Sequence, residues 1–435
     1  MNTSNKHIKG KHVSVKGTWF IALTCVAVLL GTYVNVFSYA AFVLAAIAIF
    51  ILSEEDSLCL LIFIMPFANI FKSSVEAQSF FTHLMIFYAF CGIFRKREME
   101  RSFAVSFFFL VLFFVFQMFD NIDILRTIKL LVHVLLIYIA TGIKTNDDHK
   151  KVFLSYVLGV IISSLLAALE IIPNLENYVH MKELGNAYGG ESRFAGLYPD
   201  PNYYTVNVII SLCLVIVLNH KKQIGSIALW ALVIPLVVFA IMTYSKSALF
   251  MLLLPLVMLL YSKIKRKNLL VFLILAIAAS ILFVGVFEGK IEAFDIVLQR
   301  LGSGEDIDEL TTGRASIWDT YIKHLSKIDI HTFMGAGLGA ELINGHGAHN
   351  TYIDLLYYLG IVGTTIVLIT LFRASKQKIT PKRKTVFNYS GWLCVIPLYF
   401  FLSELFYFDW SFHILMAILI NKTDMQMINK SRISF

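Results

Sequence analysis

The amino-acid sequence predicts an all-α integral membrane protein that crosses the bilayer many times. Of its 435 residues, 58% are hydrophobic and only 15% are charged, which is too apolar for a water-soluble surface. The chain has 37 phenylalanines but only 8 prolines. Its apolar runs therefore contain few helix breakers, as bilayer crossings of ~20 residues require. The same composition excludes disordered, collagen-like and disulfide-scaffold proteins.

Each apolar run bounded by polar or turn residues is interpreted as one transmembrane helix. About 14 helices, with a range of about 12 to 14, are predicted in this way. They occupy residues 18–36, 38–52, 57–71, 79–94, 102–119, 124–143, 152–172, 203–219, 224–242, 247–261, 268–287, 350–372, 385–402 and 406–421.

The polar segments between these runs divide the chain into seven parts. The first apolar run has no small-residue cleavage signal after it, so we expect an uncleaved anchor. In order, the parts are a cytoplasmic basic tail (1–17), an N-terminal transmembrane bundle (18–172), an external loop (173–202), further transmembrane helices (203–287), a large external loop with amphipathic helices (288–349), C-terminal transmembrane helices (350–421) and a cytoplasmic tail (422–435).

The distribution of basic residues indicates the orientation. With the N-terminus inside, 26 of the 37 lysines and arginines fall in cytoplasmic segments and nine fall outside. This excess follows the positive-inside rule and places both termini in the cytoplasm. The net charge of +8 is then explained by topology, and no nucleic-acid partner is expected.

No metal site or cofactor is expected. All five cysteines lie in apolar segments and none forms a CxxC pair, so neither disulfides nor a cysteine–metal site is predicted. His346 and His349 have the spacing of a metal pair, but no carboxylate ligand pattern lies nearby. Residues 306–308 match a DxD motif, yet an external acidic loop favours a solvated turn. The glycines at 335, 337 and 339 lack the preceding strand of a dinucleotide fingerprint and are interpreted as a flexible joint.

Three predicted helices begin on the external side beside a basic or imidazole group. Arg193 precedes Asn202, which is a good N-cap for the eighth span. Lys246 lies between two serines at the start of the tenth span, and Asn350 can cap the twelfth span directly after His349. Helix N-termini attract anions. Each site alone is also explained as a capped helix with a solvated charge, whereas the three together suggest one external diphosphate site.

The large external loop carries another cationic candidate. A helix starting at Thr312 would place Arg314, Trp318, Tyr321 and Leu325 on one face. A guanidinium on such an otherwise apolar, membrane-facing stripe can bind a lipid diphosphate with two hydrogen bonds. Interfacial snorkelling by an amphipathic helix is the alternative.

The positions of further titratable residues in the sequence predict a role or an environment for each of them. A neutral histidine suits proton transfer near pH 7, so His349 is a candidate to accept a proton from an attacking hydroxyl or to orient it. Asp354, one turn into the next helix, could orient that group but is expected to be hydrated at the interface. Glu404, Asp409 and His413 are expected to be exposed in a loop.

Arg126 and Lys129 stand one turn apart near the outer end of the sixth predicted span, just after Asp120 and Asp123. Intramembrane cations are costly and therefore suggest a function. Two interpretations remain open, because the pair can bind a lipid phosphate or form a structural cluster with the two aspartates.

Four stretches resemble the O-antigen ligase and polymerase superfamily, the Wzy/WaaL-like enzymes of bacterial surface polysaccharide assembly. They are an R-x-x-G-x-x-x-x-P-N stretch (193–202), a serine–basic–serine motif (245–247), a T-G-R helix (312–318) and a G-x-G...H-N-x-Y...G-x-x-G run (337–363). The resemblance covers about residues 190–370, and the last run is its most specific part. Where the family has an arginine, this chain has Lys246. The lysine keeps the positive charge but loses the bidentate geometry of a guanidinium.

The resemblance implies a helical GT-C-like architecture and metal-independent, inverting transfer of undecaprenyl-diphosphate-linked glycans, which serve as donor and acceptor. As catalytic residues, Arg193 and Arg314 would hold the departing diphosphate, and His349 would activate the acceptor or assist at the diphosphate. The expected substrate-binding residues are Lys246, Asn202, Asn350, Arg126 and Lys129.

The expected function is that of a polymerase. It would join lipid-linked repeat units into a capsule, exopolysaccharide or O-antigen chain at the outer face of the bacterial cytoplasmic membrane, with a flippase and a chain-length regulator as partners. A ligase uses the same donor and differs in its acceptor. A flippase or transporter requires charged groups near span midpoints and short external loops, whereas here the midpoints are almost free of charge and the longest loop is external.

Overall fold

The computed structural model describes residues 15–74, 77–96, 99–117, 123–142, 146–173, 175, 193–243, 245, 248, 251–256, 258, 313–375, 390–396, 398–401 and 409–430. Every regular element in these ranges is a helix, which confirms the all-helical class. The elements are α1 (Val15–Gly31), α2 (Val36–Ile51), α3 (Glu54–Ile64), η1 (Met65–Phe67), α4 (Phe80–Lys96), α5 (Arg101–Gln117), α6 (Ile124–Ala140), α7 (Asn146–Ala168), α9 (Pro201–His220), α10 (Ser226–Met242), α15 (Arg314–Leu325), α16 (Ile330–Met334), η2 (Ile343–Gly345), α17 (Thr351–Ser375), α18 (Ser390–Val395), η4 (Leu398–Phe401) and α19 (Trp410–Lys430).

The described helices agree with a helical membrane protein. In α7, α9 and α17, the stretches Asp148–Ala168, Pro201–His220 and Thr351–Ser375 are long and apolar enough to cross a membrane, and six shorter apolar helices accompany them in the described ranges. The predicted span at 268–287 and the amphipathic stretch near 291–301 lie outside the described residues.

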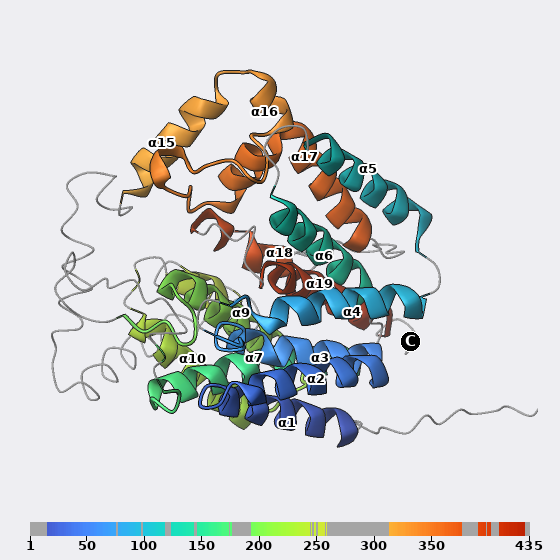
Figure 1. The fold of residues 1–435 in the computed structure, drawn as a ribbon. Helices are drawn as coiled ribbons and strands as arrows, with labels where there is room; N and C mark the ends of the chain where they lie inside the picture. Colours follow the sequence, from blue (N-terminus) through green and yellow to red (C-terminus); the bar gives the residue numbers. More distant parts are fainter. Residues whose placement is uncertain are drawn as a thin grey trace, which may run out of the picture.

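The helices pack in two groups, one around α9 and one around α17 (Figure 1). Helix α9 contacts α7, α10 and α19, while α17 contacts α5, α6, α15 and α16. In the apolar stretch of α9, 89% of the residues are buried, against 44% for α17. A helix that is apolar on all sides belongs in the centre of a bundle. Helices α6 and α19 join the α9 side of the molecule to the α17 side.

Two of the predicted straight spans are interrupted. The run at 57–71 forms α3 only as far as Ile64, and the short helix η1 follows with Pro66 at its start. Proline lacks the N–H group that an α-helix would need there. Helix α17 is broken at Gly360, whose backbone angles are φ 62° and ψ −174°. Only glycine adopts this conformation readily.

The break in α17 is where the loop from 335 to 337 docks. Ala336 and Gly337 donate backbone hydrogen bonds of 2.8 and 3.1 Å to the carbonyls of residues 357 and 358. A Cβ atom on Gly335 or on Gly360 would collide with the backbone of the other segment. The expectation of a flexible joint is therefore wrong for this stretch, because its glycines allow two backbones to pack directly against each other.

Replacing Gly360 by alanine should destabilise the protein. The new methyl group would meet the backbone of Phe333 and Gly335 in a conformation that alanine avoids, at a cost of about 2 kcal/mol or more. We expect the unfolding temperature of the detergent-solubilised protein to fall by roughly 2 °C or more. Gly225→Ala is the control, because nothing lies within 4 Å of that position. Equal unfolding temperatures for the two variants would show that the break tolerates a side chain.

A buried polar cluster joins α9 to the start of α19. Asn207 accepts a hydrogen bond from Tyr156 (2.6 Å) and donates to Asp409 (2.8 Å) and to the Tyr203 carbonyl (3.1 Å). His413 Nε2 lies 3.1 Å from Asn207 Oδ1 and 3.7 Å from Asp409 Oδ2. Asp409 and His413 are both 0% exposed, so the expectation of an exposed loop is wrong for them, whereas Glu404 lies outside the described residues. The Asn207 amide therefore supplies polar partners inside the bundle for Asp409 Oδ2 and for His413 Nε2, as buried polar groups require.

Candidate functional site

The first turn of α9 forms one wall of the candidate site. Its N-cap is Asp200, whose carboxylate accepts a hydrogen bond of 2.6 Å from the Asn202 backbone N–H. Pro201 takes the first helical position, where its missing N–H group costs nothing. The prediction that Asn202 is the cap is therefore wrong by two residues. The Asn202 side chain instead accepts a hydrogen bond of 2.7 Å from Ser245, which joins two of the stretches that carry the resemblance.

Arg193 lies against the end of α10. Its Nε donates a hydrogen bond of 3.0 Å to the Thr243 carbonyl, and the next backbone N–H, of Phe194, donates to Met242. These contacts hold the 193–200 segment in place beside Ser245. Lys246, the predicted third basic group, lies outside the described residues.

Arg314, the first residue of α15, reaches the first turn of α9. Burial lowers the pKa of its guanidinium, and the nearby Asp200 carboxylate and Tyr203 act in the opposite direction. An arginine stays protonated in any protein environment, so the site keeps a half-buried positive charge. Gly313 precedes the helix with φ 78°, and Thr312, the predicted start, lies outside the described residues.

The apolar face of α15 packs on the protein, not on the bilayer as the sequence suggested. Trp318 donates a hydrogen bond of 2.7 Å from Nε1 to the Ala348 carbonyl, and Tyr321 donates one of 2.8 Å to the His346 carbonyl. Tyr321 is only 1% exposed, and burial raises the pKa of its phenol, so the hydroxyl remains a donor. Arg314 is one helical turn before Trp318, and the Ala348 carbonyl that Trp318 binds directly precedes His349 in the chain.

His349 and Asn350 form the entry to α17. The Asn350 side chain accepts hydrogen bonds from the backbone N–H groups of Tyr352 (3.0 Å) and Ile353 (3.3 Å), which confirms the predicted N-cap. His349 has a φ of 48°, a left-handed conformation that costs of order 1 kcal/mol and often marks functional sites. Asp354 is 4% exposed, so its predicted hydration at the interface is wrong.

Arg126 and Lys129 lie in a second cluster on α6. Asp123 caps this helix by accepting from the Arg126 backbone N–H (3.0 Å), and its carboxylate lies 3.3 Å from Arg126 Nε. Arg126 also donates a hydrogen bond of 2.9 Å to the Leu338 carbonyl. These contacts support the structural interpretation of the cluster. Lys129 is half-buried one turn further along, and Asp120 lies outside the described residues.

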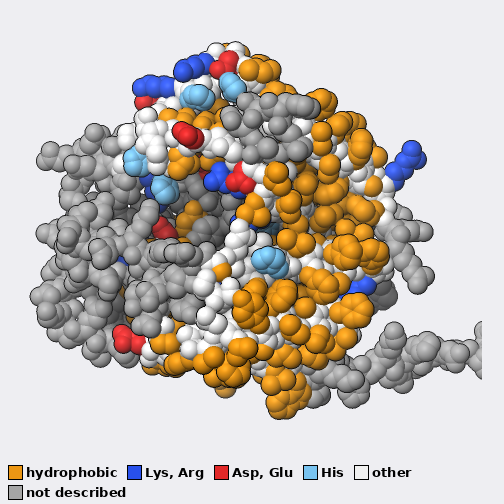
Figure 2. All heavy atoms as spheres, viewed as in Figure 1, with side chains coloured by type: hydrophobic (Ala, Val, Ile, Leu, Met, Phe, Trp, Pro, Cys, Tyr) orange, Lys and Arg blue, Asp and Glu red, His pale blue; other side chains and the backbone are white. Residues whose placement is uncertain are grey.

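The described contacts link four of the predicted residues indirectly. Arg193 and Asn202 both bind the segment that follows α10, at residues 243 and 245. Asp200 lies near Arg314, and Trp318 of the same helix binds the carbonyl that precedes His349. Figure 2 shows a hollow on this face between the α15–α16 layer and the helices below it, with histidine, basic and acidic side chains gathered around its rim. The guanidinium groups of Arg193 and Arg314 can attract an anion, and His349 supplies an imidazole at the entry to α17.

Several residues that shape the site were not predicted from the sequence. Asp200 lies between two prolines, and proline at the first helical position could have identified it as the cap. The carbonyl of Thr243 has no sequence signal, because any residue supplies one. Gln117 donates hydrogen bonds to the Met334 (2.8 Å) and Tyr358 (3.1 Å) carbonyls at the break in α17, which only the tertiary structure reveals.

Comparison with protein-family models, curated proteins and solved structures found no match. Among the described residues, no group of three or more histidine, cysteine, aspartate or glutamate side chains could hold a metal ion. The function proposed below is therefore built on the residues of the site and on their geometry.

Proposed function

We propose that this chain is a glycosyltransferase of bacterial surface polysaccharide assembly, and specifically a polymerase of lipid-linked repeat units. It would lie in the cytoplasmic membrane with about 14 transmembrane helices, both termini inside and the site on the outer face. Donor and acceptor would be undecaprenyl-diphosphate-linked glycans. A flippase that supplies them and a chain-length regulator are the proposed partners.

The observation that carries this proposal is the link from Arg314 to two other motifs. Its guanidinium lies near Asp200 at the start of α9, and Trp318, one turn later, binds the carbonyl that directly precedes His349. A diphosphate leaving group requires donors aimed at the negative charge that develops on it. Guanidinium groups match phosphate oxygens in pairs. The half-burial of Arg314 keeps this charge away from full water screening.

The reaction that fits these groups is a displacement at the anomeric carbon. The acceptor hydroxyl oxygen forms a bond to this carbon while the bond from the carbon to the diphosphate oxygen breaks. The bonding electron pair leaves with the diphosphate, where Arg193 and Arg314 stabilise it, and the hydroxyl proton passes to His349. Attack from the face opposite the leaving group inverts the anomeric centre.

Transport of a lipid-linked glycan is the alternative from another class, and the buried pair of Asp409 and His413 bears on it. Proton-coupled transporters place such pairs near the bilayer midplane. The partner of this pair, Asn207, stands six residues after the start of α9, which is about 9 Å along the helix axis. In the proposed orientation, with α9 entering a ~30 Å hydrocarbon core at its first residue, a depth of about 9 Å would put the pair in the outer part of the core. Its position therefore favours a structural role beneath the site.

Deleting the gene in its host tests the proposal. Surface glycans are separated by length on a gel, and lipid-linked glycans are extracted from the same cells and scored for the side of the membrane they face. We expect loss of long surface chains and accumulation of single repeat units on outward-facing lipid. Supplying the wild-type gene should restore the chain lengths.

The same experiment separates the alternatives. Long chains that remain attached to the lipid carrier would indicate a ligase and not a polymerase, because polymerisation would then have occurred without this protein. Repeat units trapped on the inner face would indicate a flippase and would overturn the proposal. An unchanged glycan profile in the deletion strain would exclude all three functions.

A further inference from the structure

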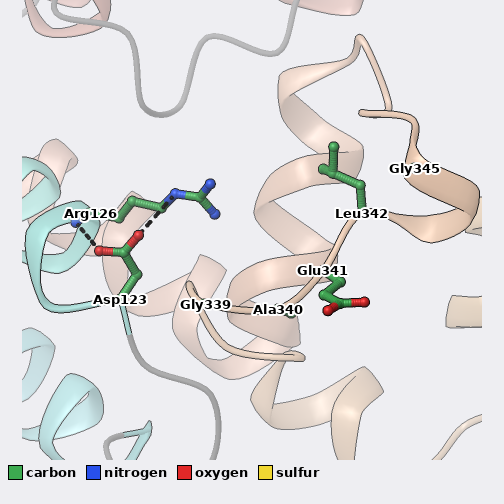
Figure 3. Close-up of a pocket in the computed structure, with 7 residues that line it drawn as sticks. All are labelled: Asp123, Arg126, Gly339, Ala340, Glu341, Leu342 and Gly345. Atoms are coloured by element: carbon green, nitrogen blue, oxygen red, sulfur yellow. Dashed lines mark hydrogen bonds and ion pairs between the residues drawn. The ribbon is translucent and has the colours of Figure 1, made fainter. Parts of the chain in front are cut away.

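A pocket of about 480 Å³ lies between the start of α6 and the loop that leads to His349. Its lining residues are Asp123, Arg126, Gly339, Ala340, Glu341, Leu342 and Gly345. Figure 3 shows the Arg126 guanidinium pointing into the gap, with Asp123 beside it and Glu341 on the opposite side. The volume is within the range of ~300–1,000 Å³ that is typical of small-ligand sites.

The charges of this pocket do not suit a phosphate group. Its side chains include two carboxylates, of Asp123 and Glu341, and one guanidinium, of Arg126. The carboxylate of Asp123 already lies 3.3 Å from Arg126, so the pocket as a whole carries one net negative charge. A phosphate only accepts hydrogen bonds and would be repelled. A sugar hydroxyl both donates and accepts, so it can bind to a carboxylate and to a guanidinium at once.

The wall formed by the loop is held in a fixed shape. Arg126 binds the Leu338 carbonyl at 2.9 Å, and the Tyr357 hydroxyl donates a hydrogen bond of 2.7 Å to the Glu341 carbonyl. The contacts of α15 described above hold the far end of the loop. Because the backbone is fixed before a ligand arrives, little conformational entropy is lost on binding.

We propose that this pocket binds a sugar of the acceptor glycan, an inference that rests on the proposed glycosyl transfer. Gly345 precedes His349 by four residues, which limits their separation to about 14 Å. One glycan can therefore contact the pocket and present a hydroxyl group to His349. The diphosphate of the donor binds elsewhere, at Arg193 and Arg314. Asp123 and Glu341 accept hydrogen bonds from the sugar hydroxyls, and Arg126 donates to them.

The test uses the full chain in lipid nanodiscs and a defined probe. The probe is the oligosaccharide released by mild acid from lipid-linked repeat units of the deletion strain. Its dissociation constant is measured for the wild type and for Glu341→Gln, together with the KM of donor and acceptor in a transfer assay. We expect the substitution to weaken probe binding and raise the acceptor KM by about tenfold, with the donor KM unchanged. Inorganic diphosphate should not displace the probe.

Two further variants make the result specific. Asp123→Asn keeps a good N-cap for α6 while removing the charge, and should weaken probe binding in the same way as Glu341→Gln. Asp319→Asn changes a carboxylate on α15 that is 58% exposed and outside the pocket, and should bind the probe like the wild type. Both proteins should reach normal abundance and elute as the wild type does.

The outcomes distinguish the two proposals. Unchanged probe binding by Glu341→Gln, displacement by inorganic diphosphate, or a raised donor KM would overturn the acceptor pocket. If the wild-type protein transfers glycan but does not bind the probe, the proposed role of the pocket is wrong and the proposed function of the protein still stands. Probe binding that depends on Glu341 in a protein without transfer activity would support a sugar site and contradict the polymerase.

Discussion

Replacing Arg314 by alanine is expected to lower glycan transfer at least about 100-fold, as the loss of one donor aimed at a developing anion does in other enzymes. The guanidinium is half-buried beside Asp200 and the first turn of α9. Its removal leaves a negative carboxylate where the leaving diphosphate needs positive charge. The measurement is the transfer rate of the purified protein with extracted lipid-linked repeat units.

Two matched variants separate this role from a structural one. Arg314→Lys keeps the charge but cannot bind two phosphate oxygens in a fixed plane, so its rate should lie between those of the wild type and the alanine variant. If Arg314 served only to neutralise Asp200, the additional substitution Asp200→Asn would restore transfer. We expect no recovery in this double variant, and a full recovery would exclude Arg314 from diphosphate binding.

The second large effect is expected at His349, where alanine should lower kcat by roughly 100- to 10,000-fold, the usual contribution of a general base. The donor KM should change little, because Arg193 and Arg314 remain in place. Rates at saturating donor, measured with the variant at normal abundance in the membrane, provide the test.

A changed backbone conformation could also explain a loss of activity in His349→Ala, and a second variant tests this explanation. His349 has a positive φ, and asparagine tolerates this conformation well, so His349→Asn should fold normally and be as inactive as the alanine variant. His346→Ala is the control, since this exposed imidazole lies on the same loop three residues earlier. An active His349→Asn protein would mean that the position is needed for its backbone and not for proton transfer.

The positions of the helices could be predicted because bilayer-length apolar runs carry a strong signal in one sequence. Helix α9 begins two residues before the predicted span and ends one residue after it. The interruptions were harder to predict. Gly360 lies in an apolar run without a polar neighbour, and its break depends on the backbone of Gly335, 25 residues away in the chain. Pro66 was a visible signal, since proline ends helices by rule.

The candidate site could be predicted as a set of residues but not as a set of contacts. Arg193, Arg314 and His349 were identified from motifs, whereas the hydrogen bond that links the helix of Arg314 to the residue before His349, from Trp318 to Ala348, spans 30 residues. Polar groups near span ends were predicted to be exposed, because a single sequence does not show their partners. Asp409 illustrates this, since the amide that makes its burial possible belongs to Asn207 in another helix.

The buried cluster of Asn207, Asp409 and His413 also has a consequence for biosynthesis. The two residues that form its shortest link to α19 are separated by 202 positions. At about 5–20 residues per second, ribosomes need roughly 10–40 s to make that length of chain. During this interval the Asn207 amide of α9 can bind Tyr156 and the Tyr203 carbonyl but not Asp409. The helix that carries the first turn of the site therefore reaches its final setting as one of the last events of synthesis, when α19 arrives.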